Sequence, residues 1–385
     1  MAYRKYLLIL VLLFASKVSA QENSYQQADS ISNSQYLAGE WKQLIAFGNQ
    51  NIASGTDFPA LRLRMAYAFF ITQNYAAALQ QYDEILANDT YNQTARYYAY
   101  WCNRYLNRYQ EANYHASFID KKLLKDYKIS SGLIFAGLEN SLKFPETAIR
   151  NAASYNRAFL GNRFGWRLQA EESVAYYNQS DNIRAFRQQN NYQEFDHDQF
   201  EYYQKLSYSL NSKWTILGAY HFVHSSQANH ASLLGLKFTN NKLEWQGSVN
   251  YSYLNNLKIF QYNAKLNWYP LGNLNFYTVS TAVLQSFSNN QHFVFNQLIG
   301  GKISENVWME GFATFGRQDN YLEADALYVY NYIDVTRFKT GATVYLQLNQ
   351  HVLLPLTYMF ERKNNNYQNL NYNQHSITAA LLWRF

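Results

Sequence analysis

The chain has 385 residues and a net charge of +6, and its aromatic share of 18% exceeds its charged share of 16%. A single cysteine, Cys102, excludes an intramolecular disulfide framework and any zinc or iron–sulfur site built from several cysteines. With 16 glycines, four prolines and a mean hydropathy of −0.43, the chain matches neither a collagen-like or disordered polypeptide nor a helical membrane protein.

The first 20 residues have the three parts of a secretory signal peptide. Arg4 and Lys5 precede an apolar run over residues 6–15, and a small-residue cleavage site ends at Ala20. The apolar run is shorter than the ~20 residues that span a bilayer, which favours cleavage over a membrane anchor. Without this segment the net charge falls to about +3, so we expect no nucleic-acid partner.

Residues 21–127 are predicted to form a helical domain in the periplasm. Pro59 stands where a helix would begin, and apolar residues then recur every three to four positions, as on one face of a helix. The segment 74–78 (NYAAA) has a counterpart at 108–112 (RYQEA), 34 residues later. The domain is therefore expected to contain repeated helix pairs.

A helix–turn–helix period of 34 residues resembles the tetratricopeptide repeat. The positions that match its pattern are Ala66, Phe69, Tyr75, Ala78 and Tyr82 in the first copy, and Tyr109 and Ala112 in the second. The resemblance implies a stack of helices that presents a concave surface to a periplasmic protein partner. An ordinary bundle of helical hairpins is the alternative.

From residue 128 to residue 385 the periodicity changes from 3.6 to 2. Between Lys242 and Leu254, apolar and aromatic residues alternate with polar ones throughout the run. Runs of this length exceed the average of about 5–6 residues in soluble sheets and match the ~9–11 residues of a tilted strand that crosses a bilayer. The sequence therefore predicts an antiparallel outer-membrane β-barrel.

Fourteen such runs can be traced, with 12 strands as the alternative because the first two runs are the least regular. They lie at 129–140, 150–161, 164–178, 199–210, 213–225, 229–239, 242–254, 257–269, 272–287, 291–303, 305–317, 336–349, 350–362 and 373–385. Long connections are expected at 179–198, 318–334 and 363–371. The second of these is apolar enough to fold into the lumen and gate it.

The last run ends in phenylalanine. It places Ile377, Leu381, Trp383 and Phe385 on one face. An amphipathic carboxy-terminal strand that ends in this way resembles the assembly signal of bacterial outer-membrane proteins. The resemblance implies that the barrel-assembly machinery inserts the chain into outer-membrane lipid.

The opposite face of the strands carries mixed charges and is expected to line the lumen. The candidate lumen-lining residues are Arg167, Glu171, Glu201, Lys205, Lys237, Lys242, Glu244, Lys265, Arg337 and Lys339. Basic residues outnumber acids among them. Two interpretations remain: a pore that favours anions or hydrated sugars, and a lumen held shut by salt bridges between strands.

No catalytic residue, cofactor or metal ion is expected. His221, His224 and Ser225 are candidates for a catalytic group, but we expect them to be solvated residues near a strand end, without a carboxylate partner. No glycine-rich phosphate loop or HExxH motif occurs. A barrel hydrolase is therefore only the third interpretation of this chain.

A signal peptide, a short repeat domain and a carboxy-terminal barrel together resemble repeat-plus-barrel export proteins. These include YaiO-like barrels, exopolysaccharide export porins and surface lipoprotein assembly modulators. The resemblance implies a transport or secretion conduit in the bacterial outer membrane, whose repeat domain recruits a periplasmic partner or a cargo, either polysaccharide or surface protein. A non-conducting anchor for protein–protein interaction is the alternative.

Overall fold

The amino-terminal part of the described chain is helical. The computed structural model describes residues 24–184, 192–287, 290–331, 334–365 and 369–385, so the signal peptide expected at 1–20 lies outside the described residues. Residues 24–38 are helical, followed by α2 (Trp41–Ala53), α3 (Pro59–Ile71), α4 (Tyr75–Asn88), α5 (Gln93–Tyr105), α6 (Tyr109–Ala116) and α7 (Lys121–Asp126). None of these described helices is long and apolar enough to cross a membrane.

Local sequence signals determine where the helices begin. Pro59 occupies the first position of α3, where its missing N–H leaves no partner unsatisfied. Asn74 and Asn92 cap α4 and α5 by accepting hydrogen bonds from the N–H groups of Ala77 and Ala95, at 3.2 and 3.0 Å. α5 begins 34 residues after α3, and α6 begins 34 residues after α4. The helix pairs thus recur at the expected period, while their assignment to the tetratricopeptide family stays a prediction.

Residues 24–107 and 118–120 form a compact unit with an apolar core, called here the helical unit. Ala66 and Ala78 are fully buried in it, and Tyr82 is almost fully buried. Phe69 and Tyr75 pack against the same cluster and are partly exposed. These five repeat-signature residues therefore serve helix packing: the two alanines let the helices approach closely, and the three aromatic rings pack in or against the same cluster.

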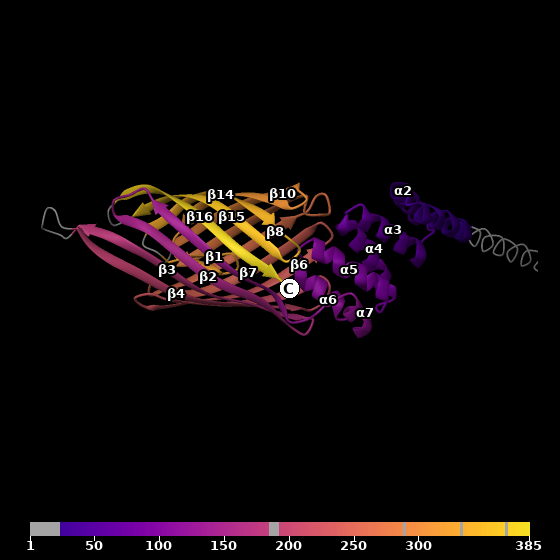
Figure 1. The fold of residues 1–385 in the computed structure, drawn as a ribbon, viewed down its shortest axis with the longest axis horizontal. Helices are drawn as coiled ribbons and strands as arrows, with labels where there is room; N and C mark the ends of the chain where they lie inside the picture. The colour runs from indigo at the N-terminus through magenta and orange to yellow at the C-terminus, as the bar shows by residue number, and fades with distance from the viewer. Residues whose placement is uncertain (1–23, 185–191, 288–289, 332–333, 366–368) are drawn as a thin grey trace, which may run out of the picture. The chain divides into compact units, whose positions relative to one another are not determined.

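Most of the remaining chain forms a closed antiparallel barrel of 14 strands within the described residues, which confirms the predicted fold class. The strands are β1 (Leu133–Pro145), β2 (Arg150–Phe164), β3 (Leu168–Arg184), β4 (Tyr192–Ser209), β5 (Trp214–His224), β6 (Ala228–Asn240), β7 (Leu243–Leu254), β8 (Leu257–Trp268), β9 (Phe276–Phe287), β10 (Asn290–Ser304), β11 (Val307–Gln318), β14 (Asp334–Gln347), β15 (Val352–Asn365) and β16 (Leu370–Arg384). The barrel closes where β16 pairs with β1 (Figure 1). Between β11 and β14 the chain forms a separate hairpin, β12 (Tyr321–Glu323) and β13 (Tyr328–Tyr330).

The strand number of 14 is right, and the alternative of 12 is wrong. The main differences from the prediction concern strand length. β3 continues to Arg184 and β4 starts at Tyr192, and these two residues pair, so the long connection expected at 179–198 is wrong. The connection expected at 363–371 is shortened in the same way by β15 and β16. Polar sequence alone suggests a loop at these places, yet backbone pairing continues because a strand end outside the bilayer tolerates polar side chains.

The barrel carries apolar side chains outside and polar side chains inside. Along β7, Trp245, Val249 and Tyr251 are exposed, whereas Ser248 and Asn250 are buried. The residues of the predicted assembly signal lie on the same outer face: Ile377, Leu381, Trp383 and Phe385. A continuous apolar outer surface around a polar interior is the arrangement of a barrel that spans a bilayer.

Candidate functional site

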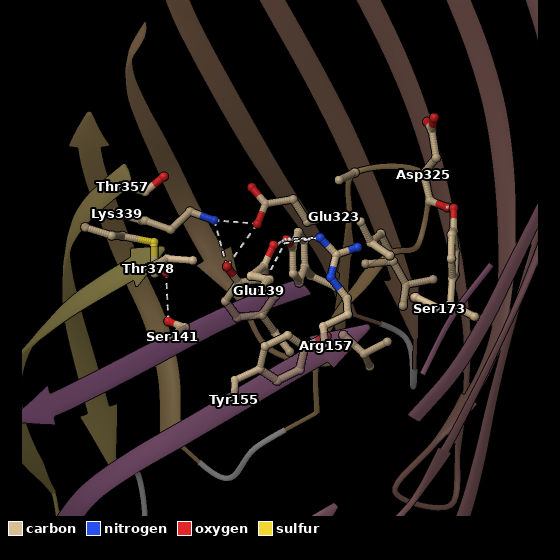
Figure 2. Close-up of a pocket in the computed structure, with 18 of the residues that line it drawn as sticks. Glu139, Ser141, Tyr155, Arg157, Ser173, Glu323, Asp325, Lys339, Thr357 and Thr378 are labelled. Carbon is tan, nitrogen blue, oxygen red and sulfur yellow. Dashed lines mark hydrogen bonds and ion pairs between the residues drawn. The ribbon is translucent and has the colours of Figure 1, made fainter. Parts of the chain in front are cut away.

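The lumen of the barrel contains a cavity of about 780 Å³. Inward-facing side chains of the strands line it, together with the β12–β13 hairpin (Figure 2). Its wall combines an ion pair between Glu139 and Arg157, the hydroxyl groups of Ser141 and Thr378, and aromatic rings such as that of Tyr155. Fourteen strands enclose more space than their own side chains fill, so both a cavity and an inserted segment fit inside.

The β12–β13 hairpin folds into the lumen from the rim where β11 ends and β14 begins. Leu322 and Ala326 of this segment are buried in an apolar cluster with Leu217, Leu254 and Ile259 of the wall. The described residues of the connection 318–334 therefore fold inward, as the sequence predicts.

Side chains of the barrel wall contact the backbone N–H and C=O groups of the hairpin segment. The amide of Gln261 donates to the carbonyl oxygen of Leu322 at 2.7 Å and accepts from its N–H at 3.1 Å. The Nδ1 atom of His221 lies 2.7 Å from the carbonyl oxygen of Ala326. These contacts matter because buried backbone groups without partners are costly.

Charged residues also attach the hairpin to the wall. Lys339 Nζ lies 2.5 Å from Glu323 Oε2, and Lys205 Nζ lies 3.5 Å from Asp325 Oδ2. The hydroxyl of Tyr328 donates to a carboxylate of the wall at 3.3 Å. Figure 2 shows Lys339 and Glu323 facing each other across the cavity edge. The hairpin is thus held both by polar contacts and by two apolar clusters, the second of which joins Tyr321 to Val283 and Val294 of the wall.

Helix α6 packs with the barrel. Residues 108–117 group with residues 121–385 in one compact unit, so a domain boundary after residue 127 cuts across the observed contacts. Glu111 of α6 is fully buried, and it receives Lys237 Nζ at 3.0 Å and the hydroxyl of Thr239 at 3.0 Å. Two repeat-signature residues, Tyr109 and Ala112, therefore lie on a helix of the barrel unit.

The contacts of α6 cross one mouth of the barrel. Arg163 at the end of β2 donates to Asn113 at 2.7 Å, and the Ser209 hydroxyl at the end of β4 donates to an α6 carbonyl at 2.9 Å. The guanidinium of Arg108 lies 5.1 Å from the centre of the Tyr269 ring, just after β8. These strand ends share the rim where β16 ends, opposite the rim of the hairpin.

The predicted lumen-lining residues fall into several groups. Those that line the cavity are Glu171, Glu201, Lys205, Lys265 and Lys339. Lys237 and Glu244 instead stand beside α6, where Glu244 lies 3.8 Å from Arg108. Lys242 donates to a carbonyl in a rim turn at 2.7 Å, and Arg167 lies 5.0 Å from the ring of an α6 tyrosine. The sequence thus identified inward charges without distinguishing the cavity from the mouth.

Arg337 does not line the lumen. The pairing of β14 with β15 is irregular between Thr336 and Phe338, which makes Arg337 the extra, exposed residue of a bulge. Thr336 and Lys339, on either side of the bulge, are buried in the interior. The prediction for Arg337 is wrong because strict alternation does not allow for an inserted residue.

Several charged residues of the cavity were missed by the sequence reasoning. Lys143 and Lys363 lie just beyond the expected ends of their runs, residues 140 and 362, whereas β1 and β15 continue past them. Extending the period-2 pattern by a few residues finds both. Glu139 and Arg157 lie on the first two strands, whose pattern is the least regular.

His221 is buried and has a carboxylate partner, contrary to expectation. Its Nε2 atom lies 3.3 Å from Glu201 Oε2, which also accepts a hydrogen bond from the Tyr155 hydroxyl at 3.1 Å. These residues come from three strands, and no motif in the sequence shows that they meet. Through its contact with the carbonyl oxygen of Ala326, His221 holds the hairpin, and the ion pair with Glu201 fixes the position of the imidazole ring.

Known proteins offer only a distant likeness to this chain. No protein-family profile matches it, and no curated protein matches its sequence. Similar solved structures include the outer membrane protein Omp33 of Acinetobacter baumannii, at 8% identity and a TM-score of 0.41 over 66% of this chain and 100% of that one. The toluene transporter TodX of P. putida is similar at 8% identity and a TM-score of 0.43, over 71% and 92% of the two chains. At this level of likeness the matches assign no function.

Proposed function

We propose that this protein is a transport conduit of the bacterial outer membrane, in which the β12–β13 hairpin occupies part of the lumen and α6 covers part of one mouth. The observation that carries the proposal is the cavity beside the hairpin, whose wall holds ion pairs and hydrogen-bonding side chains. A permanently sealed barrel gains nothing from such a wall, because each buried charge costs desolvation energy. A conduit needs a wall that can be hydrated.

The helical unit is proposed to lie in the periplasm. β1 begins at the rim where β16 ends, so the helices lead into the barrel at the rim that carries the carboxy terminus. The short turns 241–242 and 305–306 lie at this rim, as periplasmic turns do. The apolar outer surface of the barrel supports its location in outer-membrane lipid.

The helical unit is also proposed to bind a periplasmic partner or cargo, either polysaccharide or surface protein. Ring contacts link Tyr36, Trp41, Tyr67 and Tyr98 at centroid distances of 5.4–5.8 Å, and all four rings are partly exposed. Aromatic side chains are enriched at protein interfaces. Replacing Tyr36 and Tyr67 with Ser should reduce the partner recovered by cross-linking in intact cells, whereas Tyr91→Ser, at an exposed position, should not.

Conductance in planar bilayers tests the conduit. The wild-type protein is expected to conduct little, because the hairpin occupies part of the lumen and α6 covers part of one mouth. A variant in which residues 321–330 are replaced by a short glycine–serine linker should conduct steadily, because the hairpin no longer fills the lumen. Lys258→Gln, at an exposed position of β8, is the matched control and should behave as the wild type.

A non-conducting anchor is the second candidate, favoured by the buried contacts of α6. It predicts no current even when the hairpin replacement is combined with Glu111→Lys, which would place two ammonium groups together at Lys237. The absence of current in that variant would rule out the conduit and favour a role of the barrel as a scaffold.

A further inference from the structure

The imidazole of His221 is set between two oxygen atoms. Its Nδ1 atom lies 2.7 Å from the carbonyl oxygen of Ala326 in the hairpin. Its Nε2 atom lies 3.3 Å from Oε2 of Glu201 on β4, at ion-pair distance but without the alignment of a hydrogen bond. The side chain is almost fully buried, at 1% exposure. A carbonyl and a carboxylate are both acceptors, so each needs an N–H on the nitrogen that faces it.

A neutral imidazole beside an ionised carboxylate cannot meet both needs, because it carries a single N–H. With its proton on Nδ1, the lone pair of Nε2 faces the carboxylate of Glu201. With its proton on Nε2, the lone pair of Nδ1 faces the carbonyl oxygen of Ala326. One additional proton removes the conflict, whether the imidazole or the carboxyl group carries it. The contact of His221 with the hairpin therefore depends on a proton held by the pair of His221 and Glu201.

Other titratable groups surround this pair. Those that face His221 or Glu201 are Tyr203 of β4, Tyr155 of β2, Lys143 of β1, and Asp325 of the hairpin with its partner Lys205. From β6, Ala231 stands opposite His221 and adds no titratable group. Phenol, ammonium and carboxyl groups ordinarily change charge outside the range of about pH 5–8, whereas imidazole changes charge within it. A response of the hairpin inside this range therefore points to the pair.

The tip of the hairpin is strained where His221 contacts it. Three consecutive residues have left-handed backbone angles: Ala324 (φ 52°), Asp325 (φ 58°) and Ala326 (φ 67°). Residues with a Cβ atom rarely adopt this conformation, because the Cβ atom crowds the following carbonyl oxygen. Contacts from the wall hold the tip in it: the Tyr203 hydroxyl donates to the carbonyl oxygen of Asp325 at 3.0 Å, and Gln246 donates to its carboxylate at 2.6 Å. Because strain opposes these contacts, the loss of one of them favours release of the tip.

We propose that His221 and Glu201 form a proton-dependent latch that holds the tip of the hairpin against the wall of the lumen. While the pair carries the additional proton, both nitrogens of His221 contact their oxygens and the strained tip is held. As the pH rises, this proton passes to water of the cavity, which Glu201 lines, and one contact becomes repulsive. Acid therefore fastens the tip and a rising pH releases it. This inference rests on the proposed conduit, because it names what controls the hairpin in that lumen.

Hydrogen exchange over residues 321–330 of the full-length protein in detergent tests the latch. The quantity compared is the protection factor, the exchange rate of an unstructured chain divided by the measured rate at the same pH. This ratio removes the pH dependence of the exchange chemistry itself. Coupling to one proton changes an equilibrium by up to about tenfold per pH unit. We expect the protection factor of the wild type to fall about tenfold between about pH 6 and about pH 8.

Two variants of the pair should respond in opposite ways. His221→Gln removes the titrating ring, so protection should be low at both pH values. Glu201→Gln places an amide beside Nε2 that donates to the neutral ring or accepts from the charged one, so protection should be high at both. The matched control is His224→Gln, at an exposed position of the same strand, and its exchange should follow the wild type. So should that of His292→Gln, which alters the histidine 3.4 Å from Asp319, before the hairpin.

Protection in the wild type that stays constant or rises with pH would overturn the latch. A pH response that persists in His221→Gln, or that is lost in His224→Gln, would also overturn it. Glu201→Gln decides the matter where His221→Gln does not fold, since a fall like that of the wild type would remove the carboxylate from the latch. The exchange measurement needs no current. A latch that responds to pH in a barrel without conductance would remain while the conduit is removed, and conductance without such a response would do the reverse.

Discussion

The helical unit and the barrel bury opposite kinds of side chain, although one chain forms both. In the helical unit Leu61 and Met65 are fully buried, whereas in the barrel the fully buried side chains include Gln285 and Thr314. Both regions satisfy their backbone hydrogen bonds within their own elements, so that requirement does not separate them. The difference lies in what each face meets: water around the helices, and lipid around the barrel. The excess of aromatic over charged residues therefore reflects the barrel, whose outer surface is apolar, whereas the helical unit has its apolar residues in its core.

The largest effect is expected where a helix enters the polar interior of the barrel. Lys237→Met leaves Glu111 of α6 buried without its cation, which should weaken the docking of α6 by about 3–5 kcal/mol. Hydrogen exchange over residues 108–117 should lose protection accordingly.

The control for this prediction is Lys213→Met, which removes an exposed lysine and should leave the exchange unchanged. Combining Lys237→Met with Glu111→Gln removes both charges and should restore much of the protection. Unchanged exchange in Lys237→Met alone would show that the ion pair does not hold the helix.

The next effect contrasts two exposed leucines. Leu234 lies at the middle of β6 on the outer face and is 68% exposed, while Leu37 in the helical unit is 76% exposed. Leu234→Arg should cost about 2–4 kcal/mol in urea unfolding from lipid vesicles, because it places a charge in the hydrocarbon. Leu37→Arg should change stability by no more than about 0.5 kcal/mol, since its surroundings are water. Equal losses of stability for Leu234→Arg and Leu37→Arg would contradict a lipid-facing outer surface of the barrel.

The same contrast explains what the sequence could predict. Alternation along strands such as β7 reports the chemistry of two faces, and it gave the barrel and the strand number. It does not report which side chains of different strands meet. For that reason it missed the contact between His221 and Glu201, and it could not foresee the bulge at Arg337. Helix α6 shows a related limit: its spacing indicates a repeat, yet its buried contacts are with the barrel.

Glycine-to-alanine changes should give a smaller difference between the two regions. A Cβ atom added at Gly48 in the helical core would overlap the side chain of Met65, whereas one added at Gly247 on β7 meets nothing within 4 Å. Gly48→Ala should therefore destabilise the helical unit by about 1–3 kcal/mol through overpacking. Gly247→Ala should change the barrel by about 0.5 kcal/mol or less. Thermal unfolding of both variants measures this, and a neutral Gly48→Ala would mean that the helical core is loosely packed.

The last prediction concerns the smallest effect, the pH dependence of labelling at the native Cys102 in the helical core. Burial raises the pKa of its thiol well above the ordinary value. Because the thiolate is the reactive form, raising the pH from about 7 to about 9 should accelerate maleimide labelling of the unfolded chain, while the folded chain stays slow. The unfolded thiol also releases its proton first, so the same rise in pH should favour unfolding slightly.

A variant that combines Cys102→Ala with Ser54→Cys provides the control, since residue 54 is exposed and its thiol should follow the ordinary pH profile in the folded protein. Labelling of native Cys102 that accelerates with pH as steeply as this control would mean that water reaches the helical core. The contrast between an apolar helical interior and a polar barrel interior would then no longer hold.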